Sequence, residues 1–265
     1  MKTRIQISCR RLGAAWRAVR VLPALITGIA LLPSGRVAAQ TFTNLYSLNA
    51  GTDGANPQAG LVLSGNTFYG TTVNGGASGY GTVFAVNTDG TGYTNLYSFA
   101  SSDGANPQAG LVLSGNTLYG TTANGGAPGY GTVFSIGTNG MGFSNLYSFS
   151  YNDGANPQTG LILSGNTLFG TTQYGGNSGA GTVFTLSTDG TVFTSLYTFT
   201  YGSDGAFPMA GLVLSGNTLF GTAQYGGDSG VGTVFALSTN GFTFTTLYTF
   251  TNGSDGAYPV AGVVL

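Results

Sequence analysis

Short apolar segments separated by polar, glycine-rich turns run through most of the chain. In residues 105–149 this pattern predicts four strands, at 110–113, 117–121, 132–136 and 143–149. β-Branched and aromatic residues fill these segments, whereas Gly, Asn, Asp and Ser separate them, as in strands joined by turns. Ser114-Gly115-Asn116 can supply the positive φ angles of a tight hairpin between the first two strands. No segment shows the 3.6-residue periodicity of a helix, so the pattern predicts an all-β fold.

The same four-strand unit recurs at a period of about fifty residues, which is the signature of a repeat architecture. The sequence Asp-Gly-Ala begins at Asp53, Asp103, Asp153, Asp204 and Asp255. The only change in length falls between a Leu-Tyr motif and the Asp that follows it, which marks a surface loop between fixed elements. Complete units are therefore expected at about 55–99, 105–149, 155–199 and 206–250.

Four antiparallel strands in about fifty residues match the size of one blade of a kelch-type β-propeller. Residues 42–48 are then expected to form an orphan outer strand, and residues 261–265 the inner strand of a fifth blade. Two interpretations of the missing middle strands stay open: the chain is truncated at its C-terminus, or the ring is open. Exposed edges without Lys favour aggregation, so truncation is the preferred one. A flat solenoid is the alternative fold.

Two stretches of the repeat carry a family resemblance. The segment AGLVLSGNTLYGTTANGG resembles the kelch layout, although no Trp lies on its outer strand. The longer pattern of LYSF, SDGANP, AGLVLSGNTLYGTT, a Gly-Gly loop and GTVF resembles the GloVer tandem-repeat family of secreted bacterial proteins. That resemblance implies an extracellular repeat protein, often with a C-terminal sorting or anchoring segment, and no defined biochemical activity.

The first 39 residues differ in character from the repeats. Basic residues crowd positions 2–20, an apolar run follows from 21 to about 32, and Arg36-Val37-Ala38-Ala39 precedes Gln40. This arrangement predicts a secretory signal peptide over 1–39, cleaved between Ala39 and Gln40. An uncleaved anchor is the alternative, but the run is shorter than the ~20 residues that span a bilayer. The repeat domain, 40–265, is therefore expected outside the cell, at the cell surface or in the periplasm.

The composition of the repeat domain excludes several kinds of chemistry. From Gln40 onward the chain contains no Lys, Arg, His, Cys, Trp or Glu. These absences exclude disulfides, Ser–His or thiol catalysis, His/Cys metal sites and Schiff-base lysines. Since a surface without cations cannot neutralise phosphates, nucleic acid is excluded as a partner. No cofactor and no membrane span are expected in the mature chain.

The two longer loops of each unit are expected on one rim of the propeller, and the two tight turns on the other. One long loop contains Asp-Gly-Ala and a following Pro, and the other contains Gly-Gly. The candidate binding residues on this rim are Asp53, Asp103, Asp153, Asp204, Asp255, Asn74, Asn124, Tyr80, Tyr130, Tyr174 and Tyr225. Binding residues are concentrated on loops that a rigid scaffold positions, so this rim is the face to test.

Simpler interpretations compete with binding at each of these residues. The recurrent Asp is first expected to accept hydrogen bonds from its own loop as an Asx turn. Calcium is disfavoured because it takes six to eight oxygens and each loop offers one carboxylate. The loop tyrosines can stack on sugar rings, but packing or shielding of the loop is the favoured interpretation, as is packing between blades for the strand aromatics.

Three functions remain. An exported, non-enzymatic scaffold or interaction protein comes first, because it requires no reactive residue; its ligand is unknown, with another extracellular protein as one candidate. Lectin-like carbohydrate binding is the alternative and predicts several weak, equivalent sites that act by avidity. An Asp-based glycoside hydrolase comes third, because the Asp residues recur at equivalent positions, whereas an acid and a base require unlike environments.

Overall fold

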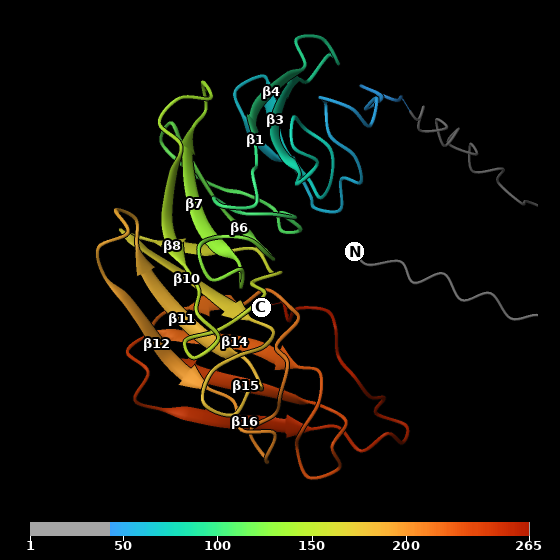
Figure 1. The fold of residues 1–265 in the computed structure, drawn as a ribbon. Helices are drawn as coiled ribbons and strands as arrows, with labels where there is room; N and C mark the ends of the chain where they lie inside the picture. The colour runs from blue at the N-terminus through green and yellow to red at the C-terminus, as the bar shows by residue number, and fades with distance from the viewer. Residues whose placement is uncertain (1–42, 265) are drawn as a thin grey trace, which may run out of the picture. The chain divides into compact units, whose positions relative to one another are not determined.

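The computed structural model describes residues 43–264, in which all regular structure is β-strand. The strands form four separate four-stranded antiparallel sheets, and in each sheet the strands lie side by side in chain order (Figure 1). The sheets are β1 to β4, β5 to β8, β9 to β12 and β13 to β16. The predicted signal peptide, with Ala39 and Gln40, lies outside the described residues.

The strand bounds repeat closely from sheet to sheet. The first sheet contains β1 (Val62–Ser64), β2 (Thr67–Thr72), β3 (Thr82–Asn87) and β4 (Thr94–Ser98). The second contains β5 (Val112–Ser114), β6 (Thr117–Thr122), β7 (Thr132–Gly137) and β8 (Ser144–Ser148). The third contains β9 (Ile162–Ser164), β10 (Thr167–Thr172), β11 (Thr182–Ser187) and β12 (Phe193–Thr198). The fourth contains β13 (Val213–Ser215), β14 (Thr218–Ala223), β15 (Thr233–Ser238) and β16 (Phe244–Thr249). The predicted all-β fold with four complete blades is confirmed.

The first strand of each sheet is shorter than the sequence predicts. In the second sheet β5 starts at Val112 instead of Gly110, and it pairs with β6 over only three residues. The preceding residues are held by the sheet before: Asn106 N donates to Tyr80 O at 2.8 Å, and Thr71 Oγ1 donates to Ala109 O at 3.1 Å. The chain therefore crosses from one sheet to the next before it joins its own ladder.

The strands expected at 42–48 and 261–265 are wrong for the described parts of these ranges, 43–48 and 261–264, which join no ladder. Strand structure requires a neighbour to accept and donate the backbone hydrogen bonds. These segments are placed by other contacts instead. Tyr46 stacks on Tyr93, with ring centroids 4.2 Å apart, and Thr222 Oγ1 donates to Ala261 O at 3.2 Å.

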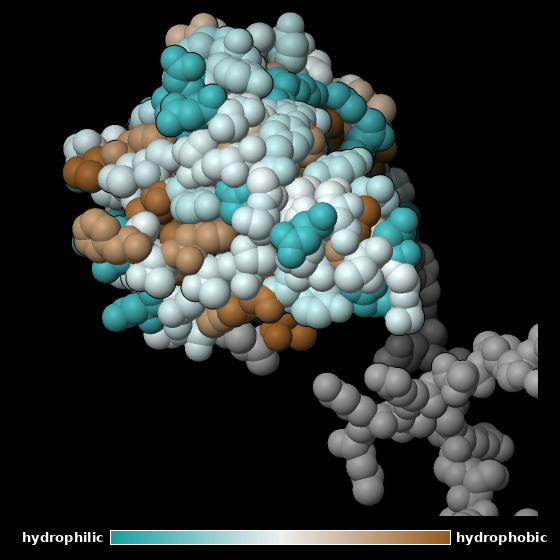
Figure 2. Space-filling model, turned by 90° about the horizontal axis from the view of Figure 1, so that it is seen from below, coloured by the Kyte–Doolittle hydropathy of each residue, from teal (hydrophilic) through white to brown (hydrophobic). Residues whose placement is uncertain are grey.

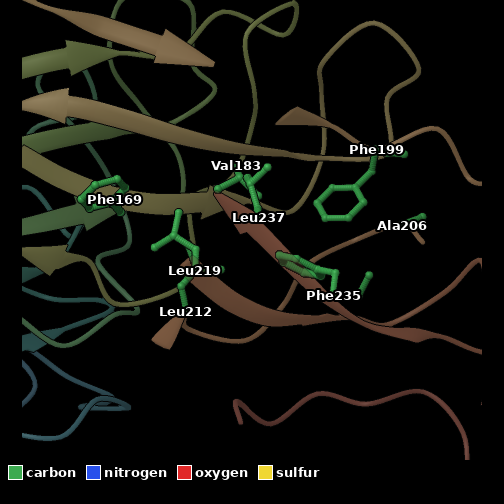
Figure 3. Close-up of a cluster of buried hydrophobic side chains, with 10 residues drawn as sticks. Phe169, Val183, Phe199, Ala206, Leu212, Leu219, Phe235 and Leu237 are labelled. Carbon is green, nitrogen blue, oxygen red and sulfur yellow. The ribbon is translucent and has the colours of Figure 1, made fainter. Parts of the chain in front are cut away.

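The middle strands of each sheet are the most buried. In β6 every residue after Thr117 is buried, as is every residue of β7 before Gly137. Their side chains form apolar clusters between one sheet and the next. In the cluster of Figure 3, Phe199 follows the third sheet and meets Phe235 of the fourth with ring centroids 5.2 Å apart. Burial of such aromatic side chains is the main apolar contribution to the stability of each sheet pair.

One outer-strand contact repeats at every junction between sheets. Tyr97 of the first sheet stacks on Phe143 beside the second, with centroids 3.7 Å apart. The same pair recurs as Tyr147 with Phe193 and as Tyr197 with Phe244, each at 3.9 Å. Near-parallel rings at this distance cover one face of each ring, so these stacks set the spacing of neighbouring sheets as well as burying apolar area.

The surface of the repeats is weakly polar. Figure 2 shows one face on which pale residues of intermediate hydropathy predominate and brown apolar groups are scattered. This matches a chain in which only 6% of residues are charged. Within residues 43–264 no helix is long and apolar enough to cross a membrane.

A glycine in the second strand makes room for the core phenylalanine of the third. A Cβ on Gly170 would lie 2.5 Å from Cζ of Phe184 and 3.0 Å from Leu161. We therefore expect Gly170→Ala to lower the free energy of unfolding by about 1 to 3 kcal/mol, measured by urea denaturation. The matched control is Gly160→Ala, because the nearest atom to a Cβ there is 3.9 Å away. Equal effects of the two changes would contradict this account of the core.

Candidate binding rim

The long loops of each repeat lie together, as do the tight turns. Ala105, in the Asp loop, forms an antiparallel bridge with Asn124, at the start of the Gly-Gly loop. At the other end of the sheet Thr138 N donates to Asn116 O at 2.9 Å, which joins the two turns. The structure thus brings the long loops together at one end of each sheet. We call this end, formed by the Asp loops and Gly-Gly loops of all repeats, the rim.

The recurrent aspartates accept a hydrogen bond from the tyrosine of the preceding Leu-Tyr motif. The hydroxyl-to-carboxylate distances are 2.7 Å for Tyr46–Asp53, 2.7 Å for Tyr97–Asp103, 2.8 Å for Tyr147–Asp153, 3.1 Å for Tyr197–Asp204 and 2.9 Å for Tyr248–Asp255. Sequence reasoning missed the tyrosine. The available signal was that Leu-Tyr precedes every Asp by a nearly constant number of residues.

From Asp103 onward, each of these aspartates also accepts a hydrogen bond from a backbone N–H three or four residues upstream in its own loop. Ser150 N and Ser150 Oγ donate to the Asp153 carboxylate at 2.9 and 2.8 Å. Thr200 donates to Asp204 in the same way, from N at 2.9 Å and from Oγ1 at 2.7 Å. The donors come from upstream in the chain, whereas an Asx turn bonds to a residue downstream. The carboxylates therefore act as internal acceptors within the loop.

The backbone of the Asp loop is fixed to the third strand of its own repeat. Thr182 Oγ1 donates to Asp153 O at 3.2 Å, and Thr182 also shares a hydrogen bond with Thr172 at 2.8 Å. Both threonines are fully buried. Buried hydroxyls require partners, so this pair favours a single position of the loop.

Burial and the neighbouring Asp carboxylates together raise the pKa of three of these tyrosines. Burial, followed by interaction with Asp103, Asp153 and Asp204, raises the pKa of Tyr97, Tyr147 and Tyr197 well above its usual value. A proton that is both desolvated and donated to an anion is hard to remove. At the last repeat the hydroxyl of Thr251 is the main cause that lowers the pKa of Asp255.

The rim of the first repeats carries a chain of amides. Asn156 Nδ2 donates to Asn124 Oδ1 at 2.9 Å, Asn124 Nδ2 to Asn106 Oδ1 at 3.2 Å, and Asn106 Nδ2 to Asn74 Oδ1 at 3.3 Å. Asn106 and Asn156 also donate to a backbone carbonyl of the preceding repeat, at 3.0 and 2.9 Å. We call these four residues the amide half of the rim.

In the later repeats aromatic rings occupy the equivalent places. Phe207 lies against Tyr174, Tyr201 and Tyr225, with centroid distances of 5.0, 4.9 and 5.6 Å, and Tyr225 lies 5.1 Å from Tyr258. We call these five residues the aromatic half of the rim. Of the tyrosines predicted from sequence, Tyr174 and Tyr225 belong to it, whereas Tyr201, Phe207 and Tyr258 were not anticipated.

The other two predicted tyrosines have different surroundings. Tyr130 meets Tyr151 edge to face at 5.5 Å, and its backbone oxygen accepts a hydrogen bond from Asn156 N at 2.9 Å. Tyr80 likewise accepts Asn106 N through its backbone oxygen. Their rings are exposed at the edge of the rim.

The aspartates do not converge into one site. Between residues 43 and 264, no group of three or more His, Cys, Asp or Glu side chains lies close enough together to hold a metal ion. Each predicted Asp instead belongs to the loop of its own repeat, beside its own tyrosine. The side chains on the rim that contact one another from repeat to repeat are the amides and the aromatic rings.

Removal of one hydroxyl tests the Tyr–Asp interaction. We expect Tyr147→Phe to lower the free energy of unfolding by about 1 to 2 kcal/mol, because it removes a donor to a charged, partly buried acceptor. Denaturant titration measures the change. The control Tyr130→Phe alters an exposed hydroxyl and should change stability by less than about 0.5 kcal/mol. A result in which both variants match the parent protein would contradict the structural role of the pair.

The raised tyrosine pKa values also predict alkaline unfolding. A group whose pKa is raised on folding contributes stability that is fully present below its unfolded pKa, near ~10, and is lost as the pH rises through the folded pKa. We therefore expect part of the tyrosinate absorbance to develop only well above pH ~10, together with loss of the far-ultraviolet circular dichroism signal. A complete titration near ~10 with an unchanged dichroism signal would contradict this.

Comparison with solved structures identifies the architecture. A chain of the nidogen/laminin complex aligns with a TM-score of 0.50 at 16% identity, over 74% of this chain and 63% of that one. The extracellular domain of BT4673 from B. thetaiotaomicron aligns with a TM-score of 0.51 at 9% identity, over 78% and 24%. TolB from Acinetobacter baumannii aligns at 0.46 and 12%, over 69% and 40%. The chain spans less than two thirds of each of these structures. At such identities the first two alignments show the fold alone, which is propeller-like.

Sequence comparison gives the family. No curated protein sequence matches the chain. The model of the Gloeobacter/Verrucomicrobia repeat matches residues 36–213 and, in a second overlapping match, residues 114–265. Together these matches cover all four sheets and the segments on either side of them. The chain, with its repeated Asp loops and four-stranded sheets, therefore belongs to the Gloeobacter/Verrucomicrobia repeat (GloVer) family.

Proposed function

We propose that this repeat protein is an exported, non-enzymatic scaffold that presents the loops of its rim to a ligand or partner. The observation that carries the proposal is the hydrogen bonding of the recurrent aspartates. Asp103, Asp153 and Asp204 each accept a tyrosine hydroxyl and a backbone N–H from their own loop. Carboxylates used in this way stabilise the loops and are poorly placed to act on a substrate.

The equivalence of the repeats supports a scaffold over a hydrolase. Glycoside hydrolysis by two carboxylates requires one to hold a proton while the other is ionised, so their surroundings must differ. Here Asp103 and Asp153 both act as acceptors: each accepts a tyrosine hydroxyl, at 2.7 and 2.8 Å, and a backbone N–H at 2.9 Å, and Asp153 accepts the Ser150 hydroxyl as well. Nothing in these surroundings separates an acid from a base.

Two observations support a location outside the cytoplasm. Residues 1–39 carry the pattern of a secretory signal peptide, with basic residues, an apolar run and Ala39 before Gln40. The extracellular domain of BT4673 has a similar fold.

Expression of the full chain in a bacterial host tests both parts of the proposal. We expect the protein in the periplasm or the medium, with an intact mass that corresponds to a chain starting at Gln40. The same preparation should release no reducing sugar from neutral polysaccharides. Retention in the cytoplasm with the first 39 residues attached would contradict export.

The matched variant for the enzymatic part is Asp153→Asn. Suppose that the parent protein turns over a polysaccharide and that Asp153→Asn abolishes this turnover but keeps the fold. That result would contradict a non-enzymatic role and would place the catalysis at the Asp153 loop. Circular dichroism and the denaturation midpoint of the variant separate a lost reaction from a lost fold.

A further inference from the structure

The loop residues that meet between neighbouring repeats change in pairs. Asn74 faces Asn106, and Asn124 faces Asn156, each through side-chain hydrogen bonds. At the next two junctions both members are aromatic: Tyr174 meets Phe207, and Tyr225 meets Tyr258. The repeats are therefore not identical at the rim: the amide half offers hydrogen-bonding amides and the aromatic half offers aromatic rings.

The aromatic replacements occur where the backbone disfavours them. Asn106 and Asn156 have φ of 56°, in the left-handed region that asparagine tolerates better than other residues with a Cβ. Phe207 and Tyr258 occupy the same position with φ of 55°, and Tyr201 has φ of 65°. Bulky residues with positive φ are strained, and such strain is concentrated at functional sites.

Internal packing alone does not account for these rings. The amide pairs already join neighbouring repeats, and they satisfy backbone carbonyls that an aromatic ring cannot. The tyrosines of the aromatic half also remain open to solvent: Tyr174 is 38% exposed, Tyr225 39%, Tyr258 45% and Tyr201 50%. Their contacts with Phe207 and with each other are edge-to-face or tilted, so no single contact covers both faces of a ring.

We propose that the aromatic half of the rim, Tyr174, Tyr201, Phe207, Tyr225 and Tyr258, binds a neutral polysaccharide. The apolar C–H faces of pyranose rings can lie on tyrosine rings, which carry a negative face, and the tyrosine hydroxyls can bond the sugar hydroxyls. Rings from consecutive repeats lie beside one another, so an extended chain can contact several of them. The proposal rests on the scaffold function proposed above and gives that scaffold a class of ligand.

The charge of the repeats selects a neutral ligand. From Gln40 onward the chain has no Lys, Arg or His, so an anionic polymer finds no cation to pair with. Asp204, between Tyr201 and Phe207, is buried and accepts hydrogen bonds from Tyr197 and Thr200. Asp228, close in sequence to Tyr225, is exposed and can accept hydrogen bonds from sugar hydroxyls.

A protein partner or a second copy of the chain fits the aromatic half less well. Protein interfaces commonly combine Tyr and Trp with Arg at their centre, and the repeats contain neither Trp nor Arg. Tyrosines that are 38% to 50% exposed suit a hydrated, hydroxyl-rich ligand better than a dry interface. Self-association is nevertheless one of the outcomes that the test distinguishes.

The test uses a double variant that copies a pair already present in the protein. Tyr174→Asn with Phe207→Asn reproduces the Asn124–Asn156 pair, and Asn at 207 suits the positive φ, so the variant should fold. The probes are soluble galactomannan and hydroxyethylcellulose, with alginate as the anionic comparison, in affinity electrophoresis of the purified chain. We expect galactomannan or hydroxyethylcellulose, but not alginate, to retard the parent protein, and the double variant to bind about tenfold more weakly.

The converse variant, Asn124→Tyr with Asn156→Phe, extends the aromatic half by one repeat and should bind the same neutral probe more tightly than the parent protein. Three results would overturn the proposal: no retardation by either neutral probe, equal retardation of parent and double variant, or equal retardation by alginate. Self-association of the parent in sedimentation, lost in the double variant, would also overturn it in favour of a second copy. Because purified protein is used, failure here leaves the export experiment above unaffected.

Discussion

The tyrosine of the Leu-Tyr motif makes two contacts at once, and the order of the repeats depends on both. In Tyr147 the ring stacks on Phe193 of the next sheet at 3.9 Å, while the hydroxyl donates to Asp153 at 2.8 Å. Asp153 lies in the loop that leads into that next sheet. One side chain therefore fixes the separation of two sheets and the path of the chain between them. The ring and the hydroxyl belong to one side chain, so the rotamer that stacks on Phe193 is also the one that reaches Asp153.

This arrangement divides the Asp loop into an inner part that is constant and an outer part that varies. The carboxylate of Asp153 faces Tyr147 and Ser150, and its carbonyl accepts Thr182. The following Pro packs against the previous repeat, where a Cβ on Gly131 would lie 2.6 Å from Pro157 Cδ. These contacts recur with small changes from repeat to repeat. With the inner part fixed, the residue between Ala and Pro can change from Asn to Phe or Tyr without moving the loop.

The fold could largely be predicted from sequence because periodicity and turn residues act locally. Strands, hairpins and four complete blades all follow from them. The short first strand could not, because Asn106 and Ala109, just before it, form hydrogen bonds with residues of the preceding repeat that are far away in sequence, such as Thr71 with Ala109. Similarly, 43–48 looks like a strand in composition, but strand structure requires a partner ladder. The Asp was correctly placed in its loop, yet the donor that decides its role, the upstream tyrosine, comes from a neighbouring element.

The change from asparagine to aromatic residues between the two halves of the rim can be read from the sequence, but its meaning depends on knowing which side chains contact each other. Asn74 and Asn106 are 32 positions apart, so their pairing is a property of the junction between sheets and not of either repeat. In the structure, Tyr174 and Phe207, which stand where an earlier repeat has two asparagines, contact each other and so form the two sides of one altered junction. A change of that kind at a position with φ of 55° is maintained against a backbone preference for asparagine. The scaffold therefore determines where the loops lie, and the paired residues at its junctions determine what each part of the rim can bind.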